Sequence, residues 1–377
     1  MQFIDLNAQQ QPIRQLIEER IKRVLDHGKY ILGPEVKELE ETLADYVGVP
    51  HAVGVASGTD ALLMSLMACD VGPGDAVFTV PFTFIATAEV IRLLGATPVF
   101  VDIDPGTWNM DAAALEKAVE RVADARELRP RCVMPVDIFG QAADYGTINA
   151  VARRHDLVVL EDMAQSFGAS QGDRRAGRLG DIGGTSFFPA KPLGAYGDGG
   201  MIFVSEEEMK DTLCSLRVHG KGRTKYENVR IGVNGRLDTL QAAILLAKFT
   251  VFPAELDQRQ QVAARYAEGL GDLVTLQEVQ PENISAWAQY SMRHPRRDDI
   301  CVALREEGIP TAIYYPVPLH LQPAFSDMGH GPGDFPISEA VAKDIFSLPF
   351  HPYLEEKDQA GIVEVVRTTI EKLEKDK

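Results

Sequence analysis

The residue with the clearest chemical potential is Lys191, in the segment 186–200 (SFFPAKPLGAYGDGG). Aromatic and proline residues precede this lysine and a glycine-rich turn follows it, which is an unusual setting for a surface lysine. Burial would lower the pKa of its amine, as attack on an aldehyde and proton transfer near neutral pH require. The segment therefore predicts a reactive lysine. The alternative is a surface lysine whose stem lies along apolar neighbours.

A second candidate is Asp162, which follows the apolar run 157–160 and precedes Gln165. A carboxylate at the end of a buried strand faces the crevice in which open α/β sheets bind ligands. Such an aspartate can keep the ring nitrogen of a bound pyridine protonated, which makes the ring an electron sink. The alternative is a helix N-cap directly after the strand.

The segment 56–60 (ASGTD) could bind an anion. It lies between a predicted strand and a predicted helix, where backbone N–H groups and a hydroxyl meet at the helix N-terminus. A phosphate could bind there, although an ordinary capped turn has the same residue types. Phe84, after the next predicted strand, could stack on a planar ring or belong to the core. His219 is a candidate for the rim of the same site.

Alternating strands and helices are predicted to position these candidates. Pro12, apolar residues at helical spacing and Gly28 predict a first helix, and residues 34–47 predict a second. Strands are then predicted at 51–56, 76–80, 98–102, 133–137, 157–160 and 200–204, with helices at 59–68 and 86–94. This alternation predicts an α/β fold with a mostly parallel central sheet sandwiched by helices. The candidate residues would share the carboxyl edge of that sheet.

The character of the sequence changes near Pro253. A charged helix there precedes short strand-like segments at 287–292 and 311–315 and a closing helix at 355–373. A chain of 377 residues is long enough for two domains. We therefore expect a large domain over residues 1–250 and a smaller α+β domain over residues 251–377. Residues 326–334 predict a flexible surface loop.

Composition argues against several partners. The net charge of −17 disfavours nucleic acid and anionic membranes, because both are bound through clusters of Lys and Arg. No segment reaches the roughly 20 apolar residues of a membrane span, and the N-terminus lacks the apolar run of a secretory signal, so a cytoplasmic location is expected.

The four cysteines have neither zinc-site spacing nor disulfide density. We expect no metal site and cysteines that are small buried residues.

Together these segments resemble the DegT/DnrJ/StrS family of sugar aminotransferases over nearly the whole chain. The matching motifs occur in order at 30–34 (YILGP), 57–61 (SGTDA), 82–87 (FTFIAT), 161–165 (EDMAQ), 186–191 (SFFPAK) and 232–243 (GVNGRLDTLQAA). The resemblance implies a fold-type I enzyme that depends on pyridoxal 5′-phosphate (PLP) and passes through pyridoxamine 5′-phosphate in turnover. It also implies an obligate homodimer with shared active sites, a nucleotide-sugar substrate and glutamate as the usual amino donor.

The resemblance assigns a role to each matching residue. Lys191 would bind the cofactor covalently and move protons, and Asp162 would pair with the pyridine nitrogen. The other cofactor contacts would be Gln165 near the phenolic oxygen, Phe84 on the ring, and Gly58, Thr59, Ser186 and the partner subunit's Asn234 at the phosphate. The substrate contacts would be the partner subunit's Arg236, together with Tyr30, Tyr314, Tyr315 and His320.

Within the family, the chain looks most like enzymes that aminate C3 of UDP-2-acetamido-2-deoxy-ribo-hexuluronate for O-antigen and related polysaccharides. Two positions depart from the common pattern. Asp137 stands where many relatives have histidine, and Tyr314 precedes Tyr315 where many also have histidine. Both could border the sugar pocket. An enzyme that aminates C3 or C4 of a dTDP- or GDP-linked keto-deoxy sugar therefore stays open as an alternative.

Two functions of other classes compete with this interpretation. A nucleotide-binding oxidoreductase would share the parallel sheet, but the chain lacks a G-x-G-x-x-G turn after its first strand and Lys191 would have no role. A non-catalytic regulator that senses PLP or a sugar could keep the same fold. Lys191, Asp162 and Ser186 together favour an enzyme, because a regulator could lose any of them. Related sugar dehydratases have histidine at the lysine position, so Lys191 favours transamination.

Overall fold

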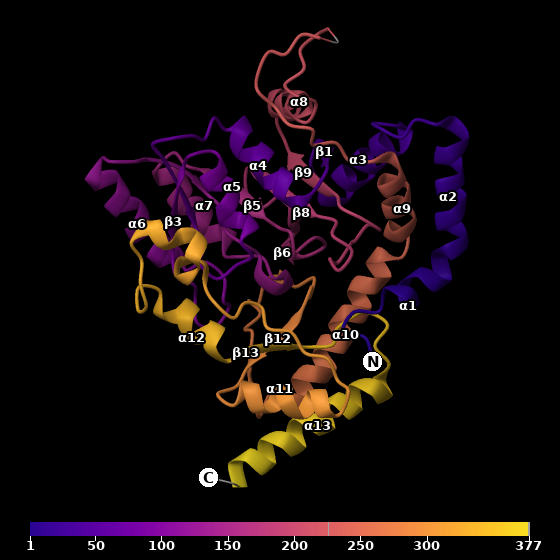
Figure 1. The fold of residues 1–377 in the computed structure, drawn as a ribbon, viewed down its shortest axis with the longest axis vertical. Helices are drawn as coiled ribbons and strands as arrows, with labels where there is room; N and C mark the ends of the chain where they lie inside the picture. The colour runs from indigo at the N-terminus through magenta and orange to yellow at the C-terminus, as the bar shows by residue number, and fades with distance from the viewer. Residues whose placement is uncertain (225, 376–377) are drawn as a thin grey trace.

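A seven-stranded sheet forms the centre of the protein, in a computed structural model that describes residues 1–224 and 226–375 (Figure 1). Its strand order is β1-β9-β8-β5-β4-β2-β3. The strands are β1 (His51–Val55), β2 (Asp75–Thr79), β3 (Thr97–Phe100), β4 (Arg129–Val133), β5 (Val158–Asp162), β8 (Ile182–Ser186) and β9 (Gly200–Val204). Only β9 is antiparallel to its neighbours β1 and β8. The other six strands therefore end at one edge of the sheet.

This sheet confirms the predicted α/β fold, with two local differences. β4 ends at Val133, where the predicted strand began, and Pro135 in the following segment has no N–H to donate to a strand ladder. β8 was not predicted, because its sequence IGGTS contains two glycines, and glycine is rare in strands. A Cβ atom at Gly183 would lie 2.6 Å from the backbone of the neighbouring turn, so only glycine fits there.

Helices cover both faces of the sheet. One hydrophobic cluster packs α4 (Gly58–Ala68), α5 (Ala86–Leu93) and α8 (Glu207–Leu216) against the first face. A larger cluster packs α3 (Pro34–Val47), α6 (Ala112–Ala125), α7 (Tyr145–Arg154) and α9 (Thr239–Phe249) against the other. The sheet is therefore buried on both sides, and ligands can approach its strands only at the edges.

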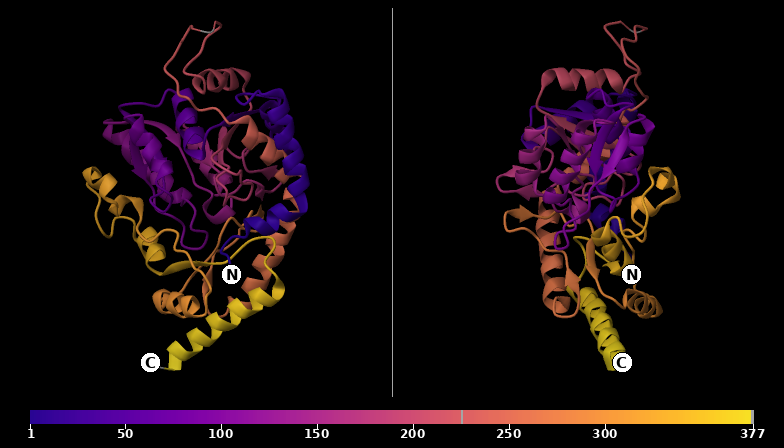
Figure 2. Two further views of the ribbon diagram at one scale, coloured as in Figure 1. Left: turned by 45° about the vertical axis from the view of Figure 1, so that its right-hand side comes forward. Right: turned by 90° about the vertical axis from the view of Figure 1, so that its left-hand side faces the viewer.

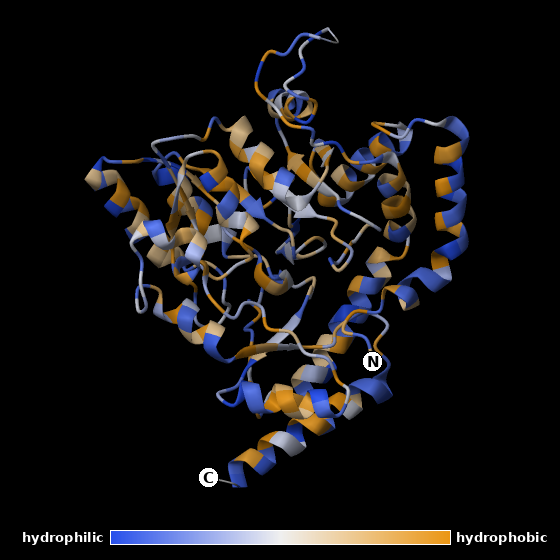
Figure 3. Cartoon of the chain, in the orientation of Figure 1, coloured by the Kyte–Doolittle hydropathy of each residue, from blue (hydrophilic) through white to orange (hydrophobic). Residues whose placement is uncertain are grey.

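The N-terminal helices lie outside these layers. α1 (Leu6–Gln10) and the 3-10 helix η1 (Gln11–Ile13) precede α2 (Arg14–His27), so helical structure begins before the predicted Pro12. α2 ends at Gly28, whose φ of 67° is left-handed, as predicted for a glycine stop. Figure 3 shows hydrophobic and hydrophilic turns along α2, and its Ile17 packs in a small cluster with Ile244 of α9.

The C-terminal part of the chain has its own core and lies below the large sheet (Figures 1 and 2). Its elements are α10 (Phe252–Leu270), β10 (Thr275–Leu276), β12 (Tyr290–Arg293), α11 (Arg297–Glu306), the 3-10 helices η3 (Leu319–Leu321) and η4 (Pro323–Met328), α12 (Pro336–Asp344), β13 (Ile345–Leu348) and α13 (Glu356–Lys375). The strand predicted at 311–315 is wrong, because only Ala312 forms a bridge there, with Ser347. The predicted loop at 326–334 begins inside η4. The division into two domains near residue 250 stays a prediction.

A third small sheet joins the two parts of the chain. It pairs β11 (Asn283–Ile284) with β6 (Ser170–Gln171), and β6 with β7 (Arg174–Arg175). Within residues 1–224 and 226–375, no single helix has the length and composition to cross a membrane; only α9 and α10 taken together do, with a bend of 61° between them.

Candidate active site

The carboxyl edge of the sheet gathers candidate residues that lie far apart in the sequence. Thr59 follows β1, Phe84 follows β2, Asp162 ends β5, and Ser186 ends β8 with Lys191 five residues later. β5 and β8 are adjacent, and Leu160 to Asp162 pair in parallel with residues 182–184. The sheet topology therefore brings the loop that carries Lys191 next to the strand end that carries Asp162.

Lys191 lies in a tight loop between β8 and β9. Its backbone N–H donates to the Phe188 carbonyl at 2.8 Å, and a Cβ atom at Gly194 would lie only 2.3 Å from the Pro189 oxygen. Desolvation by the surrounding protein lowers the pKa of the Lys191 amine, and the charge of Asp162 opposes this shift. Lys191 therefore loses its proton more readily than an ordinary lysine, and it lies within electrostatic reach of a carboxylate.

Asp162 is buried at the end of β5. Its Oδ2 accepts a hydrogen bond from the Thr87 hydroxyl at 2.7 Å, and its Oδ1 accepts one from the Ala164 N–H at 3.3 Å. Burial raises the pKa of Asp162, while these hydrogen bonds and the charge of Lys191 lower it. The residues that follow form turns rather than a helix, so the helix N-cap interpretation is wrong.

Thr87 was not singled out in the sequence, although it holds the Asp162 carboxylate. Its hydroxyl also lies 3.0 Å from the hydroxyl of Thr83, and both threonines are buried. Thr83 precedes α5 and Thr87 lies in the first turn of that helix, and no sequence pattern there points to Asp162.

Gln165 has a defined orientation. Its Oε1 accepts a hydrogen bond from the Phe139 N–H at 3.0 Å, and its Nε2 donates to the Tyr315 hydroxyl at 3.3 Å. Because a backbone N–H can only donate, the amide oxygen must face Phe139 and the NH₂ group must face Tyr315. The Tyr315 ring lies 6.4 Å from the ring of Phe84, so the structure brings these three predicted site residues together.

The N-terminus of α4 forms a cradle with Ser186. Ser57 caps the helix by accepting from the Asp60 N–H at 3.0 Å, and Gly58 and Thr59 are its first residues. The first N–H groups of a helix have no acceptor within the helix and attract anions. A Cβ atom at Gly58 would lie 2.6 Å from the Cβ of Ser186, so only glycine allows this approach. The cradle fits a phosphate group.

Asn234 and Arg236 line a different hollow of about 630 Å³ together with Ser57, Asp60 and Ile31. Arg236 forms a bridge with Val55 at the end of β1, and its buried Nε has no hydrogen-bond partner within the part of the chain that the structure describes. Tyr30, adjacent to Ile31, is exposed. These residues therefore lie beside the cradle of their own chain, and a role in a partner's site stays a prediction.

The other candidates are placed less centrally. Tyr314 is half-buried and its ring contacts Tyr315 at 5.9 Å between centroids. His320 is buried, with Nε2 3.1 Å from Glu339 Oε1 and its ring against Phe335, and its contact with the substrate stays a prediction. His219 is exposed in the long loop beyond α8 that protrudes from the body (Figure 1).

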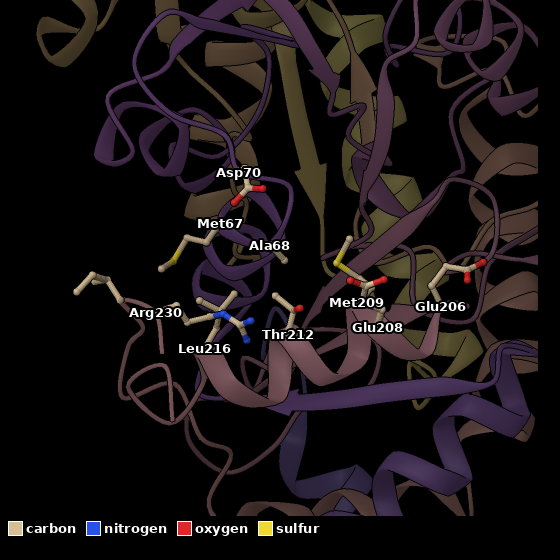
Figure 4. A pocket seen from close by; sticks show the side chains of 10 residues that line it. Met67, Ala68, Asp70, Glu206, Glu208, Met209, Thr212, Leu216 and Arg230 are labelled. Atoms are coloured by element: carbon tan, nitrogen blue, oxygen red, sulfur yellow. The ribbon is translucent and has the colours of Figure 1, made fainter. Parts of the chain in front are cut away.

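Another hollow of about 640 Å³ lies between α4 and α8 (Figure 4). Its lining includes Met67 and Asp70 at the end of α4, Glu208 and Thr212 of α8, and Arg230. None of the predicted site residues lines it. The candidate active site is therefore the carboxyl edge of the sheet.

A lysine amine with a lowered pKa, a buried carboxylate and a helix N-terminus meet at one edge of the sheet, which is the arrangement expected of an α/β aminotransferase. The chain belongs to the DegT/DnrJ/EryC1/StrS aminotransferase family, whose family model matches residues 11–367. It is 47% identical over 356 residues to the UDP-2-acetamido-2-deoxy-3-oxo-D-glucuronate aminotransferase of Pseudomonas aeruginosa, covering 94% of this chain and 96% of that protein. It is 42% identical over 368 residues to the pleiotropic regulatory protein of Geobacillus stearothermophilus, covering 97% of each.

Solved structures give the same result. The fold matches a DegT DnrJ EryC1 StrS aminotransferase from Brucella abortus with a TM-score of 0.96 and 50% identity over 98% of this chain and 99% of that one. It also matches NtdA of Bacillus subtilis, solved with bound pyridoxamine phosphate, with a TM-score of 0.88 and 28% identity over 98% of this chain and 83% of that one. The family is PLP-dependent, and the protein is a nucleotide-sugar transaminase of that family. The oxidoreductase alternative is therefore wrong.

Proposed function

We propose that this enzyme uses PLP to transfer the amino group of L-glutamate to the 3-keto group of UDP-2-acetamido-2-deoxy-ribo-hexuluronate, in O-antigen or related polysaccharide biosynthesis. The observation that carries the chemistry is the Lys191 amine, with its lowered pKa, within electrostatic reach of the buried Asp162. The choice of substrate rests on the 47% identity to an aminotransferase of a UDP-linked 3-oxo-glucuronate.

The residues at the sheet edge fit PLP. Gly58, Thr59 and Ser186 would hold its phosphate in the cradle that a Cβ atom at position 58 would fill. Asp162 would hold the ring nitrogen, and the NH₂ group of Gln165 would face the phenolic oxygen. When bound, PLP supplies an electron sink for the negative charge that develops at the substrate carbon.

Phe84 completes this fit. Its side chain is 56% exposed, although it lies beside the ring of Tyr315. An exposed aromatic face at the carboxyl edge is available to stack on a planar ring. We propose that Phe84 lies against the pyridine ring of the cofactor.

The protein's own groups perform the proton transfers. Lys191 Nζ, whose pKa is lowered by desolvation, would take the proton from the α-carbon of glutamate and return it to another carbon of the bound reactant. The Thr87 hydroxyl donates to Asp162 Oδ2 and the Ala164 N–H donates to Oδ1, which orients the carboxylate, and each oxygen can still accept from a positively charged partner. Burial raises the pKa of Asp162, and a positively charged partner would lower it and favour the ionised carboxylate.

The substrate carboxylates need a cation, and Arg236 supplies one. Its Nε lacks a partner within residues 1–224 and 226–375 and lies beside the cradle. Exposed apolar side chains near this edge include Tyr30, Ile31, Phe84 and Phe188. Apolar surface of this kind is typical of a subunit contact. We propose a homodimer in which Asn234 and Arg236 serve the site of the other subunit.

Mixed dimers test this sharing of sites. Neither Lys191→Ala nor Arg236→Ala alone is expected to be active, but co-expression should restore about a quarter of wild-type activity, because random pairing gives half mixed dimers with one intact site each. Steady-state rates of the purified mixture measure this. Co-expression of Lys191→Ala with Asp162→Ala is the control, since both residues belong to one subunit's half and no intact site can form. No recovery with Arg236→Ala would place Arg236 in its own subunit's site.

A panel of keto sugars tests the substrate. Glutamate added to the PLP-loaded enzyme is expected to abolish the absorbance band of the lysine-bound cofactor, because the amino group stays on the cofactor. UDP-2-acetamido-2-deoxy-ribo-hexuluronate should then restore the band, whereas its analogue without the C5 carboxylate should restore it more slowly. Restoration by a dTDP- or GDP-linked keto-deoxy sugar instead would leave the transaminase in place and replace the proposed substrate.

A further inference from the structure

Asp137 is a buried carboxyl group beside the site that the proposed mechanism does not use. Its Oδ1 accepts hydrogen bonds from the Ala143 N–H at 2.9 Å and the Tyr145 hydroxyl at 3.0 Å, and its Oδ2 accepts one from the Ser166 hydroxyl at 2.6 Å. Its side chain has no exposed surface. Burying a carboxyl group is unfavourable unless its hydrogen bonds are made, and here both oxygens are engaged.

These hydrogen bonds act on Gln165 from two sides. Ser166, which donates to Asp137, is the next residue after Gln165 and fixes its backbone. The bonds to Ala143 and Tyr145 close the turn that begins at Asp137, and this turn contains Phe139, whose N–H donates to the Gln165 side chain. Phe139 has a left-handed φ of 59°, which only a constrained turn holds in a residue of this size. Gln165 is therefore oriented by a structure centred on Asp137.

Asp137 is also connected to Asp162. Its backbone N–H donates to the Asp162 carbonyl at 3.1 Å, and the Asp162 N–H donates to the Pro135 carbonyl at 3.0 Å. The two segments run side by side beyond the ends of β4 and β5, with Val136 bridged to Asp162. Direct backbone hydrogen bonds therefore hold the segments of Asp137 and Asp162 together.

Asp137 lies among other acidic side chains whose pKa values are also raised. Burial raises the pKa of Asp137 to about 7, and the charge of Asp162 adds to this shift. Burial also raises the pKa of Glu161 to about 8, with Asp137 contributing. The titratable groups that act on or respond to Asp137 are Asp162 and Glu161 from β5 and the Tyr145 hydroxyl from α7. An opposing positive charge, that of Lys191, acts on Asp162.

We propose that Asp137 is a positioning residue for the transamination. It holds the Gln165 side chain with its NH₂ group toward the cofactor, and its negative charge strengthens the binding of a proton or a positive ring nitrogen at Asp162. This inference rests on the proposed function, because it depends on the roles given there to Gln165 and Asp162.

The variant Asp137→Asn separates charge from hydrogen bonding. The asparagine oxygen can still accept from Ala143 and Tyr145, and its NH₂ group can donate to the Ser166 oxygen, so only the charge is lost. The matched variant Tyr145→Phe loses one hydrogen bond and keeps the charge. Both are titrated with PLP as apoproteins, and the absorbance of bound PLP is followed between about pH 5.5 and pH 8.5.

Asp137→Asn is expected to shift the midpoint of the absorbance change down by about one pH unit, because removing a negative charge lowers the pKa of every neighbouring group. Tyr145→Phe keeps the carboxyl group but loses a hydrogen bond that lowers the pKa of Asp137, so it should shift the midpoint by less than Asp137→Asn does. Melting temperatures check folding. The raised pKa of Asp137 means that its ionisation destabilises the wild type as pH rises toward 7, so Asp137→Asn should melt at or above the wild type near pH 8.

The positioning role is tested by a double-mutant cycle. Asp137→Ala is expected to lower kcat more than KM, and to do so by a smaller factor in the Gln165→Ala background, because the two residues act through one arrangement. Equal factors in both backgrounds would overturn the positioning role, and an unshifted midpoint in Asp137→Asn would overturn the coupling of charge. If the wild type binds PLP and transaminates, either result counts against Asp137 alone. If the wild type binds no PLP, the proposed function fails together with this inference.

Discussion

Replacing Lys191 by alanine is expected to lower kcat by more than about a thousandfold. The amine would both bind the cofactor covalently and carry the proton, and positioned acid–base groups alone contribute about 10²–10⁴-fold. The loss should appear in the half-reaction with glutamate, measured in a single turnover, and the absorbance band of the lysine-bound cofactor should be absent. Lys191→Arg should fail as well, since a guanidinium group keeps its proton at all accessible pH values.

Lys248 provides a matched control for this experiment. It is buried in α9 at 1% exposure, and desolvation lowers its pKa to about 8, so by burial and pKa it resembles a reactive lysine. Its charge lies over the Tyr196 ring and its amine has no hydrogen-bond partner among the described residues. Lys248→Met should therefore keep both the absorbance band and kcat. A variant of Lys191 that retains the band, or of Lys248 that loses it, would contradict the assignment and strengthen the alternative of a regulator.

Asp162→Asn is expected to lower kcat by roughly ten- to a hundredfold. A hydrogen bond between charged groups contributes about 1.5–3 kcal/mol, and each 1.36 kcal/mol corresponds to about a factor of ten in rate. The asparagine can still accept from Thr87, so the loss reflects the missing charge rather than a collapsed site. Rates with glutamate, together with the PLP affinity of the apoprotein, measure it.

Glu161, the preceding residue, is the control for Asp162. Its carboxylate is also buried, but it accepts the backbone N–H groups of Gly177, Leu179 and Gly180, on the side of β5 away from the site. Glu161→Gln places an NH₂ group against one of these donors, which should lower stability by about 1–3 kcal/mol and leave kcat of the folded enzyme within a few-fold. A loss of kcat equal to that of Asp162→Asn would mean that negative charge at this strand end, and not direct contact of Asp162 with the ring, determines the rate.

Much of the fold could be predicted because its signals are local. Glycine stops such as Gly28, proline starts such as Pro34 and short apolar runs lie within a few residues of the elements that they define. β8 was missed because Gly183 is needed for close packing against a turn, and that requirement exists only in three dimensions. The segment 311–315 has a strand-like composition but forms a single bridge.

The residues of the candidate site likewise fall into those with a local sequence signal and those that depend on long-range contacts. Asp162 was predicted because it follows a strand-like run, and Lys191 because aromatic and proline residues precede it and a glycine-rich turn follows it. Thr87 and the orientation of Gln165 depend on contacts between segments more than 25 residues apart in the chain, and sequence patterns do not contain these. For His320, a substrate contact was predicted from the family resemblance. The structure shows its ring beside Glu339, and the substrate contact stays a prediction.

The antiparallel strand β9 fixes the Lys191 loop independently of the segments that are proposed to contact the substrate. Because β8 and β9 form a hairpin, the Lys191 loop is tied at both ends, by the pairing of Ser186 with Gly200 and the bond from the Phe187 N–H to the Gly199 carbonyl. The segments with Tyr30 and Arg236 are anchored elsewhere, before α3 and α9. If these segments contact the substrate as proposed, mutations there would alter which sugar is accepted while the lysine keeps its place, and new specificities would arise without rebuilding the reaction centre.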